Sequence, residues 1–174
     1  MDSHLVYTRT RLILLVALRV AIGWHLMYEG IAKIFQSNWS AYGYLMDSKG
    51  IFSGLFHSIA SNPGVLKVVD FINMFGLTLI GFSLIIGLFS RYAKIAAILL
   101  LLFYYLAHPP LIAAEYMFPG EGSYLWVNKN LIEMLAVAVL FVFPTGHIIG
   151  IDRLIKNYPN NNNERRKKQK TGKE

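Results

Sequence analysis

The 174-residue sequence contains no cysteine. The chain therefore cannot form a disulfide, bind a metal through thiolates or relay electrons through a dithiol. Charged residues are also scarce, at 16% of the chain, whereas hydrophobic residues make up 55%. This balance argues against a soluble globular domain and favours a membrane protein. Any redox chemistry must then belong to a bound cofactor, a substrate or a partner.

Motifs of soluble cofactor enzymes are missing as well. The sequence has no G-x-G-x-x-G, no phosphate-binding loop, no serine nucleophile elbow and no paired-histidine spacing of a membrane haem. We therefore expect no metal and no haem, although the combination of His25 with His108 leaves haem ligation open. No nucleic-acid partner is expected, because no basic face with interleaved aromatic residues accompanies the net charge of +7.

Four apolar stretches are long enough to cross a bilayer. They cover about residues 12–35, 66–89, 93–111 and 125–143, and helices of this length span a hydrocarbon core of about 30 Å. We predict an all-α, polytopic four-helix transmembrane bundle over residues 1–158, embedded in the lipid bilayer. The Asn-rich and basic residues 159–174 are predicted to form a disordered cytoplasmic tail that contacts anionic headgroups.

Basic residues also set the predicted orientation. Most of the basic residues fall on one side of the membrane, and the other side has Lys49, Lys67 and Lys129. This asymmetry and an even number of spans place both termini in the cytoplasm. The first outer loop, residues 37–65, is aromatic and lightly charged, so we expect short helices that lie on the membrane or cover the bundle. Residues 147–158 are expected to form an amphipathic helix at the membrane surface.

Polar side chains interrupt the first span along one face. An ionisable group in hydrocarbon costs at least about 2.5–3.5 kcal/mol and usually faces the protein interior. Glu29 can pair within its own helix with His25 or Lys33, each one turn away. The alternative is a structural network in which the long basic side chains extend to the headgroups. The residues of this stripe, which fall within an arc of about 120° on a helical wheel, are Arg19, His25, Glu29 and Lys33.

The other spans carry polar groups in their outer halves. Carboxylates that converge with a cation and histidines predict one polar pocket that opens outward beneath the aromatic loop, and such clusters can relay protons. Each group also has a structural interpretation, as a tie between spans, an interfacial aromatic residue or a helix cap. The groups are Asp70 and Asn73 in the second span, Tyr104 and His108 in the third, and Asn130 and Glu133 in the fourth.

Several runs of residues resemble a known family. They are Arg19-Val-Ala-Ile-Gly-Trp-His-Leu-Met-Tyr-Glu29-Gly-Ile-Ala-Lys33, Trp39-Ser-Ala-Tyr-Gly-Tyr-Leu45, Asp70-Phe-Ile-Asn-Met-Phe-Gly76, Tyr104-Tyr-Leu-Ala-His-Pro-Pro110 and Asn128-Lys-Asn-Leu-Ile-Glu133. Over about residues 10–145 the chain resembles the DoxX family, including the DoxD-like small subunit of thiosulfate:quinone oxidoreductase. The resemblance implies a four-helix protein of a bacterial or archaeal cytoplasmic membrane. In some members it also implies thiosulfate oxidation, electron transfer to a membrane quinone and a second protein subunit.

Taken with the resemblance, the residues support two hypotheses. In the first, the chain is a membrane subunit of a quinone-linked oxidoreductase acting on a small sulfur oxyanion such as thiosulfate, with Glu29, Asp70 and Glu133 as catalytic proton carriers. In the second, it is a non-catalytic anchor or assembly subunit whose polar cluster is structural. A small-solute or proton carrier is less favoured, since repeated broken-helix halves are missing. The oligomeric state is left open. The predicted binding residues for quinone or oxyanion are Arg19, His25, Lys33, Trp39, Asn73, Tyr104, His108 and Asn130.

Overall fold

The computed structural model describes residues 7–111, 116–117 and 125–154 of the chain. The helices in this part confirm the predicted all-α class. They are α1 (Arg9–Phe35), α2 (Tyr42–Met46), α3 (Ser53–Ser61), α4 (Pro63–Phe71), the π-helix η1 (Ile72–Gly76), α5 (Leu77–Ile86), α6 (Ser90–Ala107) and α7 (Lys129–Val142).

Three of these helical stretches are long and apolar enough to cross a membrane. They are Arg9–Phe35, the continuous helix Pro63–Ile86 that joins α4, η1 and α5, and Ser90–Ala107. They coincide, within a few residues, with the first three predicted spans. Helix α7 has 14 residues and a length of about 21 Å, which is shorter than a hydrocarbon core of about 30 Å. The fourth span therefore stays a prediction.

Local capping signals set the helix ends. The side chain of Asn62 accepts hydrogen bonds from the backbone N–H groups of Gly64 and Val65, which starts α4 at Pro63. Gly87, with φ of 68°, ends α5. The Asn128 side chain accepts a hydrogen bond of 3.0 Å from Leu131 N–H and starts α7. The second span runs over Pro63–Ile86, about three residues earlier than the predicted 66–89. The prediction ends later because the apolar run continues beyond the Gly87 turn.

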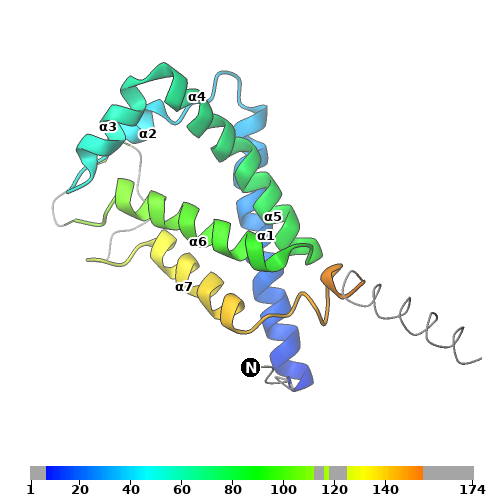
Figure 1. Ribbon diagram of the computed structural model, residues 1–174. Coiled ribbons are helices and arrows are strands. Elements are labelled where there is room, and N and C mark those ends of the chain that lie inside the picture. Colours follow the sequence, from blue (N-terminus) through cyan, green and yellow to red (C-terminus); the bar gives the residue numbers. More distant parts are fainter. Residues whose placement is uncertain (1–6, 112–115, 118–124, 155–174) are drawn as a thin grey trace, which may run out of the picture.

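Helices α1 and α5 form a tight antiparallel pair (Figure 1). Their backbones approach so closely at Gly81 that a Cβ atom there would lie 2.3 Å from the backbone nitrogen of Met27. Gly23 lies on the opposite side of the same contact, where a Cβ atom would come within 2.9 Å of the Gly81 carbonyl oxygen. Small residues at such a contact allow close backbone packing between membrane helices.

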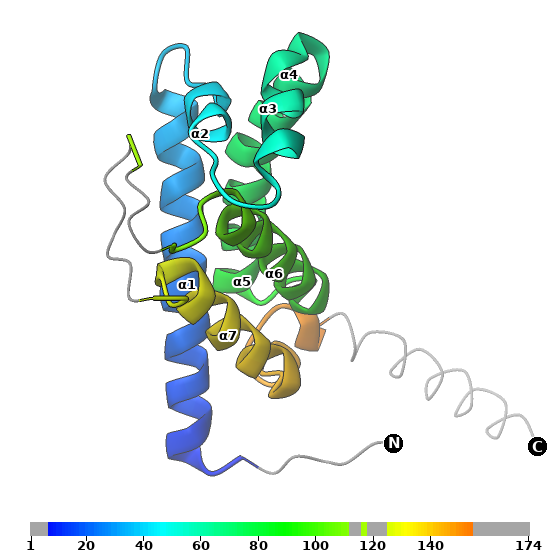
Figure 2. The same ribbon diagram turned by 90° about the vertical axis from the view of Figure 1, so that its left-hand side faces the viewer.

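Helices α6 and α7 form a second pair that crosses α1 at a steep inclination. In Figure 1 they run across the page, whereas Figure 2 shows α6 nearly end-on beside an upright α1. The buried core lies where the two pairs meet. Its most deeply buried members are Leu26 of α1, Leu77 and Leu84 of α5, Ala97 and Leu101 of α6, and Val137 and Leu140 of α7.

The two ends of the molecule differ. The end that carries α2 and α3, here called the loop end, has a small core of its own, in which Phe56 and Ala60 of α3 pack with Ala107 of α6. At the opposite end, here called the terminal end, α1 begins and α7 finishes (Figure 2). The two short helices agree with the expectation for residues 37–65, while their position relative to the membrane stays a prediction.

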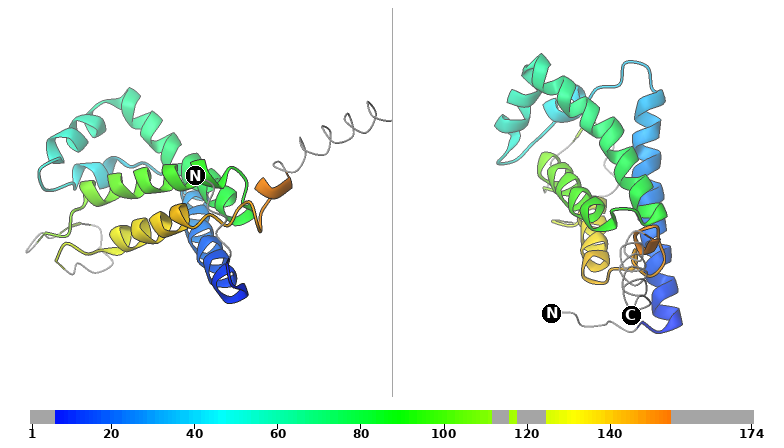
Figure 3. Two further views of the ribbon diagram at one scale, coloured as in Figure 1. Left: turned by 60° about the horizontal axis from the view of Figure 1, so that its bottom comes forward. Right: turned by 45° about the vertical axis from the view of Figure 1, so that its right-hand side comes forward.

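The segment after α7 corrects the start of the amphipathic helix expected over 147–158. Residues 146–151 form turns and bends, and helical residues begin only at Asp152, while residues 155–158 lie outside the described residues. The reason is close packing: Gly150 lies against Gly87, and Gly146 lies against Ser90, so this segment docks on the bundle (Figure 3). The predicted tail, residues 159–174, lies outside the described residues.

Candidate functional site

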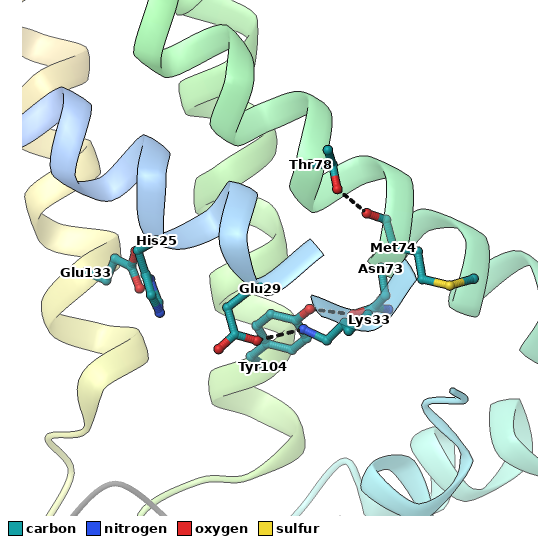
Figure 4. Close-up of polar contacts among 8 residues, drawn as sticks. All are labelled: His25, Glu29, Lys33, Asn73, Met74, Thr78, Tyr104 and Glu133. Atoms are coloured by element: carbon teal, nitrogen blue, oxygen red, sulfur yellow. Dashed lines mark hydrogen bonds and ion pairs between the residues drawn. The ribbon is translucent and has the colours of Figure 1, made fainter. Parts of the chain in front are cut away.

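The polar stripe of α1 does not converge on one place. Its four side chains contact different parts of the chain: Arg19 reaches the terminal end, His25 reaches α7, and Glu29 with Lys33 lies beside the π-helix. The single polar pocket expected from the sequence is thus divided among separate clusters. Figure 4 shows the two clusters that lie in the second half of α1.

His25 and Glu133 form the first cluster. They project toward each other from α1 and α7 (Figure 4), and Nδ1 of His25 lies 2.8 Å from Oε1 of Glu133. The Glu133 side chain is 10% exposed and the His25 side chain 34% exposed. The remaining oxygen of Glu133, Oε2, is buried and has no hydrogen-bond partner among the described residues. This pair is therefore an imidazole that is hydrogen-bonded to a carboxylate through one of its two ring nitrogens.

His25 and Glu133 both line a groove between α1 and α7, here called the His25 groove. It has a volume of about 510 Å³, within the range of about 300–1,000 Å³ that small-molecule sites occupy. Ala21 and Ile22 of α1 and Ala136 of α7 line the part of the groove nearer the terminal end, and Asn128 and Lys129 line the part nearer the start of α7. The polar lining comprises His25, Asn128, Lys129 and Glu133, and the apolar lining comprises Ala21, Ile22, Ile132 and Ala136.

The second cluster, here called the Glu29 cluster, lies one turn further along α1. Lys33 Nζ donates a hydrogen bond of 3.0 Å to Glu29 Oε2 and lies 5.6 Å from the centre of the Trp39 ring. Beside this pair, the Tyr104 hydroxyl donates to the side-chain oxygen of Asn73. The Glu29 carboxylate acts electrostatically on Tyr104 and experiences the charge of Lys129, which lines the His25 groove. Lys129 thus links the two clusters electrostatically.

The π-helix η1 holds the Glu29 cluster in place. It widens the second span by one residue, and π-turns of this kind are frequent at functional sites. Two side chains bond the neighbouring backbone carbonyls: Asn73 Nδ2 donates to Val69 at 2.9 Å and Thr78 Oγ1 donates to Met74 at 2.8 Å. Gly30 lets α1 approach this turn, since a Cβ atom there would lie 2.8 Å from the Met74 carbonyl oxygen. The sequence pattern alone does not predict η1.

Two predicted site residues lie apart from both clusters. Asp70 Oδ1 accepts a hydrogen bond of 2.7 Å from the backbone N–H of Ala41, just before α2. Asn130 lies in the first turn of α7, where its neighbours Asn128 and Lys129 line the His25 groove instead. The proton-transfer role assigned to Asp70 stays a prediction, and its observed contact ties the first loop to α4.

His108 belongs to an aromatic stack at the loop end. Its ring lies between those of Tyr44 and Tyr116, with centroid distances of 3.9 Å and 4.5 Å. Its Nε2 lies 2.9 Å from the Tyr44 carbonyl oxygen, which can only accept, so Nε2 carries a proton. Burial lowers the pKa of His108 and raises the pKa of Tyr44 and of Tyr116 from their ordinary values. His108 and His25 therefore have different partners and lie in different clusters.

Arg19 belongs to a cluster at the terminal end, here called the terminal cluster. Its guanidinium donates to Thr145 Oγ1 at 3.1 Å and to the Ile149 carbonyl at 2.7 Å, and the residue is only 2% exposed. Asp152 accepts from the backbone N–H groups of Phe89 and Ser90 at 2.7 Å and 3.0 Å, which caps the start of α6. Arg19 was predicted from the sequence, whereas Thr145 and Asp152 were missed, because their contacts join segments more than 60 residues apart.

Comparison with known proteins adds a family assignment. The family model described as DoxX matches residues 14–109, which is more than half of the chain. The matched region includes His25 and the Glu29 cluster, and it ends before α7 and Glu133. No curated protein and no solved structure matches the chain.

Proposed function

We propose that this chain, which belongs to the DoxX family and is a multi-pass integral membrane protein, binds a membrane quinone in the His25 groove as part of a quinone-linked oxidoreductase. The observation that carries this proposal is the groove itself, which combines a paired imidazole and carboxylate with four apolar side chains between two helices. An amphipathic ligand with a polar head and an apolar tail matches this lining.

The polarity of the groove supports one orientation of the ligand. Ala21 lies one turn before His25 on α1, and Ala136 lies about one turn after Glu133 on α7, so both extend the groove toward the terminal end. A head group at His25 would leave the tail beside these small side chains. Because the spans lie in lipid, a quinone can enter such an open groove from the bilayer without crossing water.

Proton transfer completes the proposed role. Conversion of a quinone to a hydroquinone consumes two electrons and two protons, and titratable side chains near the head group can supply the protons. His25 and Glu133 contact the groove, and Glu29 with Lys33 continues the line of titratable groups toward the loop end. The electrons must come from outside the chain, which has no cysteine. We therefore include in the proposal a second subunit and a small sulfur oxyanion, such as thiosulfate, as electron donor.

The proposal also includes the membrane topology. We infer that α7 crosses as a fourth span, because the apolar run 125–143 that contains it has the length of a span and α7 packs along α6, which is itself long and apolar enough to cross. With four spans, both termini lie on one face. The segments at the terminal end carry Arg9, Arg11, Arg91 and Arg153, and basic residues of this kind are retained in the cytoplasm. This face is thus assigned to the cytoplasm of a bacterial or archaeal cell.

A structural subunit is the second candidate. The observation in its favour is that several predicted site residues make hydrogen bonds within the chain, among them Arg19 with Thr145, Asn73 with Tyr104, and His108 with Tyr44. Networks of this kind stabilise membrane bundles by about 0.6 kcal/mol for each interaction on average. An anchor or assembly subunit would need these contacts and would not need the His25 groove.

Co-purification and titration separate the two candidates. We expect a protein purified in mild detergent to retain quinone that lipid extraction and mass spectrometry detect. Added short-chain quinone should quench the fluorescence of Trp24, which adjoins His25 in sequence and is 59% exposed. His25→Phe should weaken binding of the reduced form, hydroquinone, at least tenfold, while His57→Phe, on the half-buried histidine of α3, should not. Ordinary phospholipid alone, with no response to quinone, would favour the structural subunit.

A further inference from the structure

The hydrogen-bonding capacity of His25 is fixed by its partner. Nδ1 lies 2.8 Å from a carboxylate oxygen of Glu133. A carboxylate only accepts hydrogen bonds, so the proton between them belongs to Nδ1 of the imidazole. A neutral imidazole with a proton on Nδ1 presents a lone pair at Nε2. In this neutral state Nε2, the ring nitrogen that is not bonded to Glu133, acts as an acceptor.

Burial of Glu133 reinforces this tautomer. The side chain is nine-tenths buried, with 10% of its surface exposed, and Oε2 has no partner in the described ranges of the chain. Among the described residues, the Nδ1–H of His25 is thus the hydrogen-bond donor to this carboxylate. If the proton moved to Nε2, both carboxylate oxygens would lack a donor. Unpaired buried acceptors are costly, more so when charged. The carboxylate therefore holds Nε2 in its acceptor state.

From this geometry we infer that the His25 groove recognises the reduced, hydroxyl-bearing form of its ligand. The inference rests on the proposed function and deepens it. A quinone oxygen is only an acceptor and would face the lone pair of Nε2, whereas a hydroquinone O–H donates to it. The groove thus binds hydroquinone more tightly than quinone. A tenfold preference for the reduced form raises the two-electron potential of the bound couple by about 30 mV, which favours acceptance of electrons from a donor.

Three ligands of one shape test this inference on the unmodified protein. They are a short-chain hydroquinone, kept reduced under anaerobic conditions, its quinone, and its dimethyl ether, which keeps the ring but cannot donate. Binding is followed by tryptophan fluorescence and calorimetry. We expect the hydroquinone to bind at least tenfold more tightly than either of the others. Equal affinities, or tighter binding of the quinone, would overturn the inference.

Substitutions then locate the preference. His25→Phe keeps a flat ring and removes Nε2, so the three affinities should converge to within about twofold, whereas His57→Phe should keep the preference. A preference for hydroquinone that survives His25→Phe would overturn the assignment to Nε2. The proposed function fails differently. If none of the three ligands binds, or if His25→Phe leaves all affinities unchanged, then the groove is not the quinone site and both proposals fall.

Discussion

Lys94 illustrates how a single residue can hold a charge inside an apolar bundle. It is 2% exposed, and its Nζ donates a hydrogen bond of 3.0 Å to the backbone carbonyl of Leu140. In a continuous helix this carbonyl would accept from the residue four positions later, which is Pro144 and has no N–H. A cation at the C-terminus of a helix also interacts favourably with the helix dipole. Lys94 therefore acts as the cap of α7, although from the sequence it counts among the cytoplasmic charges.

The first prediction rests on this cap. Lys94→Met should lower the free energy of unfolding by about 1–3 kcal/mol, because the buried carbonyl of Leu140 loses its donor. Lys67→Met, at an exposed lysine of α4, serves as the matched control and should change stability little. Unfolding by SDS in mixed micelles, followed by circular dichroism, measures both. Equal stability of the two variants would contradict the assigned role.

The second prediction concerns His108, whose pKa is lowered by burial between Tyr44 and Tyr116. A histidine with a lower pKa in the folded state takes up its proton more readily when unfolded. Its contribution to stability is therefore complete above the ordinary pKa of about 6.5 and is lost as the pH falls below that value. The thermal midpoint should decline between about pH 6.5 and pH 5 more steeply in the unmodified protein than in His108→Phe. If the thermal midpoints of the two proteins changed with pH in the same way, then burial of the His108 ring would not contribute to the pH dependence of stability.

At the scale of elements, the contact between α1 and α5 depends on glycine. A Cβ atom at Gly81 would lie 2.4 Å from the Gly23 carbonyl oxygen and 2.3 Å from Met27 nitrogen, both of which are backbone atoms that cannot turn aside. The helices would have to separate to admit a methyl group. Separation would also move α1 away from η1, against which Gly30 packs.

The third prediction tests this contact. Gly81→Ala should destabilise the protein by about 1–3 kcal/mol, the usual cost of overpacking. Gly54→Ala is the control, since a Cβ atom on this glycine of α3 would meet nothing within 4 Å. Removing a glycine from a helix at an open position is neutral or slightly stabilising. The SDS unfolding midpoint should fall in Gly81→Ala and should stay the same or rise slightly in Gly54→Ala. An unchanged unfolding midpoint in Gly81→Ala would mean that α1 and α5 pack more loosely than the contact at Gly81 indicates.

Elements were predictable where their own residues decide them. Three spans follow from apolar length, and the short helices α2 and α3 follow from an aromatic, weakly charged loop. The π-helix η1 was not predictable, because its extra residue is stabilised by side chains that bond backbone carbonyls one turn away and by the approach of Gly30 from another helix. The steep crossing of α6 and α7 over α1 likewise depends on contacts between elements.

At the scale of the whole molecule, the chain after α7 closes the terminal end. The backbone N–H groups of Ile151 and Asp152 donate to the carbonyls of Ile86 and Gly87 at 3.1 Å and 2.9 Å. The Asp152 carboxylate also attracts the buried guanidinium of Arg19 electrostatically. The terminal cluster thus joins α1, the turn between α5 and α6, and the end of the described chain.

The fourth prediction separates this segment from the residues beyond Leu154. Truncation after Leu154 keeps the described contacts of the terminal cluster and should leave the unfolding midpoint nearly unchanged. Truncation after Phe143 removes Thr145, Ile149 and Asp152 and leaves a buried arginine without acceptors, which costs about 3–5 kcal/mol. We expect this shorter protein to be poorly recovered from membranes. Equal recovery of both truncated proteins in detergent would contradict the role of the segment.

The candidate site was predictable in its residue types and not in its pairing. Helical spacing put His25, Glu29 and Lys33 on one face of the first span, and the Glu29 to Lys33 pair follows directly from that spacing. The choice of Glu133 as the partner of His25 depends on how α7 crosses α1, over a sequence separation of 108 residues. No local pattern encodes that crossing, so the single pocket predicted from the sequence merged clusters that are separate in the structure.

The central claim is that a quinone occupies the groove between α1 and α7. The most direct test is photoaffinity labelling of the protein in liposomes with an azidoquinone, followed by peptide mapping. Labels are expected on the groove-facing positions within residues 21–25 and 128–136, with loss of labelling when excess unlabelled quinone is present. Labelling concentrated elsewhere, for example at the stack of Tyr44, His108 and Tyr116, or labelling that excess quinone does not reduce, would contradict the account.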